Sequence, residues 1–345
     1  MLTYPVLLAD IGGTYARFAV MPEAAADPTS IWKVATDGFS GPVAAIQAYL
    51  GQAGGLRPRS AFLGVAGRLG DGSTCLTNAA WVLDAREIGL AHRLHAMRIV
   101  NDYVPLAAAL TVLDGDDAAD LVRLGPAAGG TGTRLVLGPG TGLGAAALIP
   151  VEGRYLIQTT EAGHVGLGAC AADDGMPWSG LLPTQGRITA ETLLSGPGLV
   201  RIALALASSR GVTVGWQMPA EVLAARTASH PEATEAVRLF AHLLGRFAGD
   251  LALVFASTGG VFLAGGIAPR IIEDLQGPAF RSAFEDKPPF CDALHAIPRY
   301  VITRPEPAID GLAALLRDGD RFLFPGQDWR GVEAHQGCAP MATAR

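Results

Sequence analysis

The chain has 345 residues, of which 50% are hydrophobic and 17% are charged, and its net charge at pH 7 is −6. A chain of this length exceeds one compact domain, so we expect two domains with large apolar cores. The acidic balance excludes a broad basic surface for nucleic acid or for an anionic membrane, and it favours chemistry on a small molecule.

The amino-terminal part predicts a mixed α/β unit that opens with antiparallel strands. Residues 6–21 read as a strand, a Gly-Gly turn and a second strand, and residues 31–36 read as a third strand. They are followed, in chain order, by a helix at 41–54, a strand at 60–67, a helix at about 85–93, a strand at 97–102 and a helix from about 104 to 113.

The same pattern begins again after a segment rich in glycine and alanine, residues 125–133, which is our candidate for a domain hinge. Residues 134–150 read RLVLGPGTGLGAAALIP, again a strand, a glycine turn and a strand, about 130 residues after the first copy. This weak duplication predicts two related domains that face one another, each offering a glycine hairpin to a shared cleft.

Later elements complete the second domain. Residues 251–268 are uncharged and long enough to suggest a membrane span, but their central Ser-Thr-Gly-Gly indicates a helix end, a turn and a buried strand. The expected elements of this part are a long helix at about 233–257, a strand at 259–268, a helix from about 269, a strand at 299–303 and a helix at 308–319.

From these elements we expect a small amino-terminal α/β domain at 1–124 and a large α/β domain at 125–304. The helix at 305–318 is expected to pack back on the small domain. Beyond residue 319 the periodicity is lost, so residues 319–345 are expected to form a partly disordered tail.

The four cysteines lie far apart and form no CxxC pair, so neither a structural zinc site nor a disulfide framework is indicated. A reducing cytoplasm is therefore the expected location. The first residues, MLTYPVLLADIGG, have no basic segment ahead of the apolar run and do not resemble a signal peptide.

The glycine motifs exclude two common phosphate binders. A P-loop needs a lysine after its last glycine, and neither lysine of the chain, Lys33 or Lys287, follows a glycine. A dinucleotide fingerprint opens a helix, whereas Gly142 and Gly144 run into AAALIP, which has no polar face. Two interpretations remain: a hairpin whose N–H groups and Thr141 hydroxyl line the path of a polyphosphate, or a glycine-rich turn with close sheet packing.

Two aspartates end buried strands. Asp10 precedes a Gly-Gly-Thr turn, where it could meet a hydrated Mg²⁺ on a nucleotide or simply shape the turn. Asp102 follows Asn101 at the end of a strand, where it could accept the proton of an attacking hydroxyl or cap the helix that contains Pro105.

Other polar residues lie near glycines or turns. Glu161 and His164 could bind sugar hydroxyls, as could Glu191 ahead of Ser-Gly-Pro-Gly and Asn78 in Thr-Asn-x-x-Trp. The structural alternatives are a hydrogen-bonded histidine, a solvated helix glutamate and a turn beside a core tryptophan.

Three motifs together resemble those of the sugar kinases in the actin-like ATPase superfamily, and they are most similar to the bacterial glucokinase family over about residues 5–318. The motifs resemble the first phosphate, second phosphate and adenosine segments, and they read Asp10-Ile11-Gly12-Gly13-Thr14 with Arg17, Gly140-Thr141-Gly142-Leu143-Gly144, and Leu263-Ala264-Gly265-Gly266.

The resemblance implies two actin-like, ribonuclease H-like α/β domains, with mixed sheets flanked by helices and a cleft between them. It implies ATP-dependent phosphorylation of glucose to glucose 6-phosphate, the first step of glycolysis, in the cytoplasm. The hairpin glycines would make room for the β- and γ-phosphates of ATP. Members of this family are commonly homodimers, and neither nucleic acid nor a membrane is an expected partner.

The resemblance also implies roles for individual residues. Asp102 would be the catalytic base, and Asp10 would hold Mg²⁺ through water. The sugar would be bound by Asn78, Asn101, Asp102, Glu161, His164 and Glu191. The nucleotide would be bound by Asp10, Gly12, Gly13, Thr14, Arg17, Gly140, Thr141, Gly142, Gly265 and Gly266.

Two departures from the family pattern leave alternatives open. Tyr15 stands where the family usually has asparagine after Gly-Gly-Thr, so a regulator that binds sugar or nucleotide without turnover is one alternative. The related zinc-containing branch normally carries a cysteine-rich motif after its Glu-x-Gly-His segment, and only Cys170 occurs there. A kinase for another hexose or for an N-acetylated or anhydro sugar is the second alternative, and the donor could be polyphosphate or ADP instead of ATP.

Overall fold

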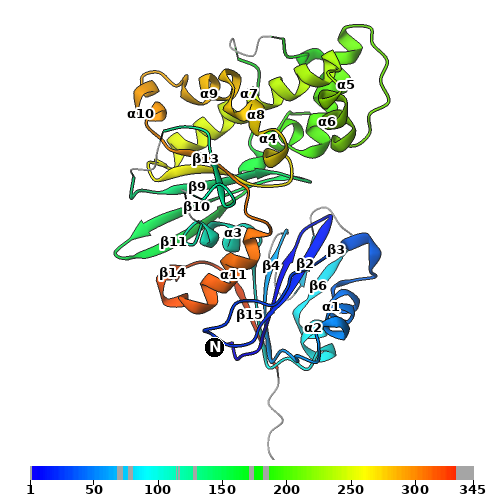
Figure 1. Ribbon diagram of the computed structural model, residues 1–345, viewed down its shortest axis with the longest axis vertical. Coiled ribbons are helices and arrows are strands. Elements are labelled where there is room, and N and C mark those ends of the chain that lie inside the picture. Colours follow the sequence, from blue (N-terminus) through cyan, green and yellow to red (C-terminus); the bar gives the residue numbers. More distant parts are fainter. Residues whose placement is uncertain are drawn as a thin grey trace, which may run out of the picture. The chain divides into compact units, whose positions relative to one another are not determined.

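A computed structural model describes residues 2–67, 73–76, 81–113, 115, 117–126, 130–170, 175–181 and 186–331 (Figure 1). The chain forms two compact units. Unit 1 comprises Met1–Asn101 with Pro325–Arg345, and unit 2 comprises Asp102–Phe324.

Unit 1 contains a six-stranded mixed sheet with the strand order β15-β7-β4-β1-β2-β3. The strands β1, β4 and β7 are parallel, while β2, β3 and β15 pair antiparallel with their neighbours. Their bounds are β1 Val6–Ile11, β2 Tyr15–Met21, β3 Trp32–Ala35, β4 Ser60–Val65, β7 Ala96–Asn101 and β15 Gln327–Arg330. A separate hairpin joins β5 (Ser73–Cys75) to β6 (Val82–Asp84).

Two helices, α1 (Pro42–Gln52) and α2 (Ala85–Ala91), supply apolar side chains to the core of unit 1. Ile46 and Tyr49 of α1 pack in one cluster with Leu7, Phe18 and Leu63 of the sheet. The central strands are buried over almost their whole length, which explains why they read as continuous apolar runs.

Unit 2 contains a seven-stranded mixed sheet with the order β14-β11-β10-β9-β12-β13-β8. The strands β9, β10 and β11 form an antiparallel meander, and β12 and β13 run parallel to β9. Their bounds are β8 Leu121–Arg123, β9 Arg134–Pro139, β10 Leu143–Val151, β11 Arg154–Thr160, β12 Gly260–Leu263, β13 Arg299–Ile302 and β14 Phe322–Leu323.

Helices cover both faces of this sheet (Figure 1). One face packs against a large apolar cluster built around the long helix α7, and the other packs against α3, on which α11 packs in turn. The bounds are α3 Tyr103–Ala109, α4 Ala190–Leu193, α5 Gly196–Ser209, α6 Pro219–Thr227, α7 Pro231–Val254, α8 Ile272–Gln276, α9 Pro278–Glu285, α10 Cys291–His295 and α11 Pro307–Arg317.

The two sheets share one topology. The order β3-β2-β1-β4-β7 in unit 1 matches β11-β10-β9-β12-β13 in unit 2, including the antiparallel meander and the two parallel strands beside it. The glycine turns between β1 and β2 and between β9 and β10 therefore occupy equivalent places. Two mixed sheets flanked by helices confirm the predicted fold class.

The division of the chain differs from the one expected after residue 124. The helix α3 belongs to unit 2 because it packs against α11, so closely that a Cβ at Gly311 would overlap the carbonyl of Pro105. The segment expected to be a hinge also lies within unit 2, where Gly130 and Gly132 contact Thr258. Periodicity identifies helices but cannot reveal such a long-range contact.

The segment after residue 319 contains two strands where a tail was expected. The strand β14 pairs with β11, and β15 pairs with the edge of β7. Trp329 of β15 packs so closely on Gly89 that a Cβ there would overlap the indole ring. Strands of two and four residues are too short to show a period, and residues 332–345 lie outside the described part.

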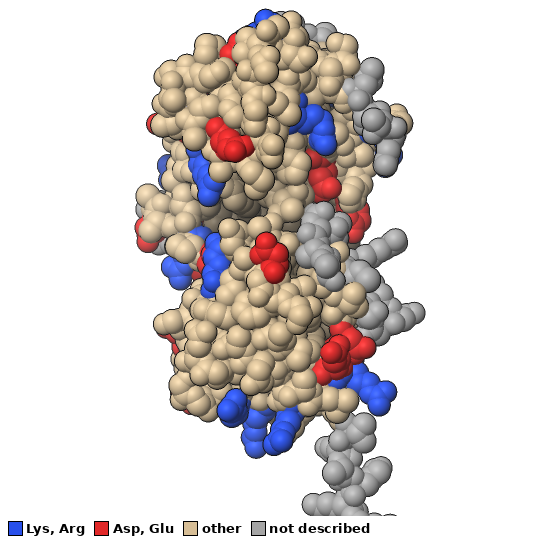
Figure 2. Space-filling model, turned by 90° about the vertical axis from the view of Figure 1, so that its right-hand side faces the viewer, with Lys and Arg blue, Asp and Glu red and all other residues tan. Residues whose placement is uncertain are grey.

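The apolar stretch at 251–268 contains the end of α7, a turn and the buried strand β12, as expected. Among the described residues no helix is long and apolar enough to cross a membrane. Most of the face shown in Figure 2 carries neither acidic nor basic side chains, and both signs occur among the charged ones.

Candidate functional site

The glycine turn of unit 1 is held by its own backbone and by a nearby threonine. The Gly12 N–H donates to the Tyr15 carbonyl at 3.0 Å, and a Cβ at Gly12 would lie 3.3 Å from that oxygen. Thr36 donates its N–H to the Thr14 carbonyl at 3.0 Å and its hydroxyl to the Gly13 carbonyl at 2.8 Å. These bonds fix the conformation of Gly12-Gly13-Thr14.

Asp10 and Arg17 face each other across β1 and β2 at the base of this turn. They are register partners, and Arg17 Nη1 lies 3.3 Å from Asp10 Oδ2. The two side chains are 15% and 20% exposed, so the carboxylate reaches solvent but lies mostly within the protein. An ion pair of this kind offsets the cost of placing a mostly buried carboxylate at a strand end.

Tyr15 begins β2 and is 44% exposed. The Lys33 ammonium lies 5.0 Å from the ring centroid, and the Arg17 guanidinium carbon lies 6.0 Å from it. The Tyr15 carbonyl, not its ring, closes the turn. The Tyr15 ring therefore takes no part in this hydrogen bond of the turn and lies beside two cationic side chains.

The glycine turn of unit 2 is bound to two helices. The Gly140 N–H donates to the Gly142 carbonyl at 2.8 Å, and the Gly140 carbonyl accepts from the Gly196 N–H at the start of α5 at 2.7 Å. The Leu143 N–H donates to Oε2 of Glu191, on α4, at 2.8 Å. The turn that contains Thr141 is thus fixed on both sides.

The glycines of this hairpin have different roles. The expectation that all of them make room for phosphates is wrong for two of them. A Cβ at Gly144 would overlap the Tyr103 ring, and one at Gly138 would lie 2.8 Å from the carbonyl carbon of Ala264. Both glycines therefore allow close packing within the protein. A Cβ at Gly140 would meet no atom within 4 Å, so that position lies in open space.

The expected adenosine segment lies beside the same hairpin. The Ala264 N–H donates to the Leu137 carbonyl at 2.8 Å, and Ile267 donates to the Pro139 carbonyl at 3.3 Å. Gly265 has φ +82°, and its backbone passes closely against Pro139. This left-handed conformation explains the glycine, and a Cβ at the next residue, Gly266, would meet open space.

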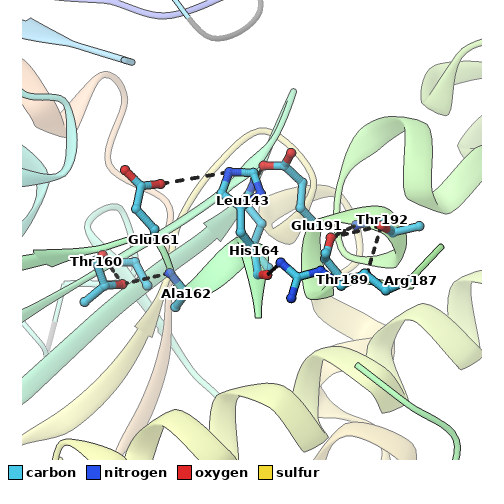
Figure 3. A network of polar contacts seen from close by, with 10 residues as sticks. Leu143, Thr160, Glu161, Ala162, His164, Arg187, Thr189, Glu191 and Thr192 are labelled. Atoms are coloured by element: carbon cyan, nitrogen blue, oxygen red, sulfur yellow. Dashed lines mark hydrogen bonds and ion pairs between the residues drawn. The ribbon is translucent and has the colours of Figure 1, made fainter. Parts of the chain in front are cut away.

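Glu161, His164 and Glu191 gather around Leu143 (Figure 3). His164 Nε2 lies 3.9 Å from Glu161 Oε2, and these side chains are 50% and 75% exposed. Gly163 lies against the Leu143 carbonyl, while Glu191 binds the N–H of the same residue. The structure thus brings together three sequence-predicted residues and leaves hydrogen-bonding atoms of two of them accessible.

The surroundings of these residues differ from one another. His164 is half exposed, and its carbonyl accepts a bond from Arg187 at 2.9 Å. Glu191 is no solvated helix residue, because its carboxylate holds the hairpin. Trp81 is a core residue whose indole N–H donates to the Phe39 carbonyl at 3.1 Å, and Asn78 lies outside the described residues.

Asn101 and Asp102 lie at the division of the chain. Asn101 ends β7 opposite Val65 of β4, in unit 1, and Asp102 is the first residue of unit 2. Asp102 precedes α3, but its side chain forms no cap hydrogen bond with that helix. The capping alternative therefore fails for this carboxylate.

Sequence reasoning missed Tyr103, Thr36 and Lys33. Tyr103 donates its hydroxyl to the Gly138 carbonyl at 3.1 Å, 35 residues away in the chain. No local pattern marks such a contact. The available signals were the aromatic residue directly after Asn-Asp and the glycines spaced by two, which together are compatible with a ring packed on a strand.

Comparisons with known proteins agree on one family. The glucokinase family model matches residues 7–319. The chain is 39% identical over 335 residues to a glucokinase of Sinorhizobium fredii, covering 95% of this chain and 97% of the relative. It is 40% identical over 333 residues to one of Chelativorans, covering 96% and 97%.

Solved structures agree on the fold. The crystal structure of a glucokinase from an Antarctic psychrotroph has a TM-score of 0.76 at 29% identity and covers 92% of this chain and 100% of its own. A ROK family glucokinase from Streptomyces griseus, solved with glucose and AMPPNP, has a TM-score of 0.63 at 22% identity, covers 91% and 99%, and shares the fold.

Proposed function

Because the chain belongs to the glucokinase family and so phosphorylates glucose with ATP, we propose that Asp102 accepts the proton of the 6-hydroxyl as its oxygen attacks the γ-phosphoryl group. The observation that carries this assignment is the position of Asp102 at the start of α3, one residue before the side chain that binds the glycine hairpin. A loose transition state requires little activation of the nucleophile, so an ordinary aspartate suffices.

The sugar would be held by Glu161, His164 and Glu191, together with Asn101 and Asn78. Carboxylate oxygens and imidazole nitrogens accept hydrogen bonds from several hydroxyls, and an unpaired acceptor penalises a sugar that lacks the matching group. The support is the clustering of the first three around Leu143. The bond between Glu191 and the Leu143 N–H thus joins this cluster to the second glycine hairpin.

The nucleotide would be held by the two glycine turns and the adenosine segment. N–H groups around Thr14 and Thr141 would neutralise charge on the transferring phosphoryl group, with Arg17 nearby. The support is that both turns are fixed by hydrogen bonds before any ligand binds, and that Gly140 borders open space. Gly265 and Gly266 would contact the nucleoside.

The residues present fit Mg²⁺ that arrives on ATP. Asp10 offers one partly exposed carboxylate, and the described residues contain no group of three or more histidine, cysteine, aspartate or glutamate side chains that could hold a metal ion. Mg²⁺ is commonly held by one carboxylate, water and substrate phosphates. Asp10 would bind it through water, and the ion would supply charge neutralisation at the phosphates.

We further propose that the protein is cytoplasmic and acts as a homodimer without nucleic-acid or membrane partners. The acidic composition supports the absence of both partners.

The first experiment measures product formation with Mg·ATP and a panel of glucose, mannose, fructose, glucosamine and N-acetylglucosamine. Polyphosphate and ADP replace ATP in parallel reactions. We expect preferential 6-phosphorylation of glucose by ATP. A preference for N-acetylglucosamine would redirect the sugar assignment, and glucose binding by calorimetry without turnover would identify a regulator instead.

A further inference from the structure

We propose that Tyr103 is a positioning residue that sets the place of Asp102 relative to the hairpin at Gly138–Gly144. The inference rests on the proposed role of Asp102 as the base. It concerns only unit 2, in which Asp102, Tyr103 and the hairpin all lie.

Tyr103 contacts both strands of the hairpin. Its hydroxyl donates to the Gly138 carbonyl at 3.1 Å, and its ring occupies the space that a side chain at position 144 would fill. Gly138 and Gly144 are register partners in β9 and β10, one pair before the turn. One side chain therefore binds the base of the turn that contains Thr141.

The rest of α3 is also fixed within unit 2. Arg134 of β9 donates to the Leu110 carbonyl at the end of the helix, and Gly311 of α11 lies against the Pro105 carbonyl. These contacts fix the middle and the end of the helix, whereas Tyr103 fixes its first residue. Because Asp102 is bonded covalently to Tyr103, movement of that ring would move the carboxylate's attachment point.

This matters because phosphoryl transfer depends on alignment. The base orients the attacking oxygen, and the hairpin would hold the phosphates, so their relative position determines how often reacting atoms are in line. Displacements near 1 Å can slow a reaction by about 100-fold. The expected defect lies in kcat, since substrate contacts themselves remain.

The test compares Tyr103→Phe with a matched control, Tyr49→Phe. Tyr49 also shares a hydroxyl hydrogen bond of 3.1 Å, with Thr29 in unit 1, and belongs to the core rather than the site. For Y103F we expect kcat per folded protein to fall about tenfold, with KM for glucose and ATP within about twofold of wild type. For Y49F we expect unchanged kcat. An unchanged kcat in Y103F would overturn the proposal.

A double-mutant cycle tests whether Tyr103 acts through Asp102. In the Asp102→Ala background, we expect Y103F to slow the residual turnover by less than about twofold, because no base remains to be positioned. A full tenfold effect in that background would assign Tyr103 to packing alone and overturn the inference.

The same cycle separates the two proposals. If D102A retains wild-type turnover, Asp102 is not the base, and both proposals fail. If D102A loses nearly all of the wild-type turnover while Y103F keeps the wild-type turnover, only the positioning role of Tyr103 fails.

Gly144→Ala perturbs the contact from the other side, because its Cβ would displace the Tyr103 ring. We expect the same pattern as Y103F, with lower kcat and little change in KM. A fall in unfolding temperature with an unchanged kcat would contradict the positioning role.

Discussion

Glu191 Oε2 accepts a hydrogen bond from the Leu143 backbone N–H at 2.8 Å. The glutamate lies on α4 and the leucine begins β10. The bond therefore joins a proposed sugar-binding residue to the hairpin that is proposed to bind phosphate. Figure 3 shows Glu191 and Leu143 in the same view as His164 and Glu161, which form the 3.9 Å pair. Sugar binding and hairpin geometry should therefore respond to the same substitution.

Two substitutions at Glu191 separate these roles. Glu191→Gln keeps an oxygen that can accept from Leu143 but removes the charge, so KM for glucose should rise about tenfold or more, with KM for ATP nearly constant. Glu191→Ala also releases the hairpin, so both KM values should rise. Initial-rate kinetics measures both, and an E191A variant with altered KM for ATP alone would remove Glu191 from the sugar site.

Asp102→Ala should lower kcat by about 10²- to 10⁴-fold, the range for loss of a positioned general base. We expect the fold to remain intact. A coupled assay gives the rate, and circular dichroism gives the folded fraction. Loss of less than about tenfold in a folded variant would disprove the role of base.

Tyr15→Asn should leave the glycine turn intact, because the Tyr15 carbonyl, and not the ring, accepts the Gly12 hydrogen bond. It should release Lys33 from its cation–π contact and raise KM for ATP by about two- to fivefold. Lys33→Met should raise KM for ATP by the same factor. The double variant should have a KM for ATP no higher than that of either single variant. A lower KM for ATP in Y15N would instead mean that the ring obstructs the phosphate path.

Protein stability should fall as the pH drops below about 6.5 because of His92. Burial lowers the pKa of His92 from its ordinary value of 6.5, and its Nε2 has no hydrogen-bond partner among the described residues. Between the lowered folded pKa and 6.5, the unfolded state binds a proton that the folded state does not. The contribution to stability is therefore present above pH 6.5 and is lost below it.

Urea unfolding at pH 7.5 and pH 5.5 measures this effect. The His92→Gln variant should lose less stability between the two pH values than the wild type, by up to about 1 kcal/mol. Equal losses in both proteins would show that His92 contributes no pH dependence.

Short-range patterns in the sequence predict the parts of the fold that depend on neighbouring residues. The strand, glycine turn and strand of each sheet show in fewer than about twenty residues, because strand burial and turn chemistry are local. Asp10 and Asp102 stand out because an acid at the end of an apolar run needs a partner or a function. The resemblance carried by these motifs then identifies the family.

Only the tertiary structure decides which residues meet across long stretches of chain. The Glu191 bond to Leu143 spans 48 residues, and Trp329 reaches Gly89 across most of the sequence. The tertiary structure also shows that Gly138 and Gly144 pack closely against other parts of the protein, whereas Gly140 borders open space. These outcomes depend on how helices dock on sheets, and docking is set by the shape of whole faces rather than by any local period.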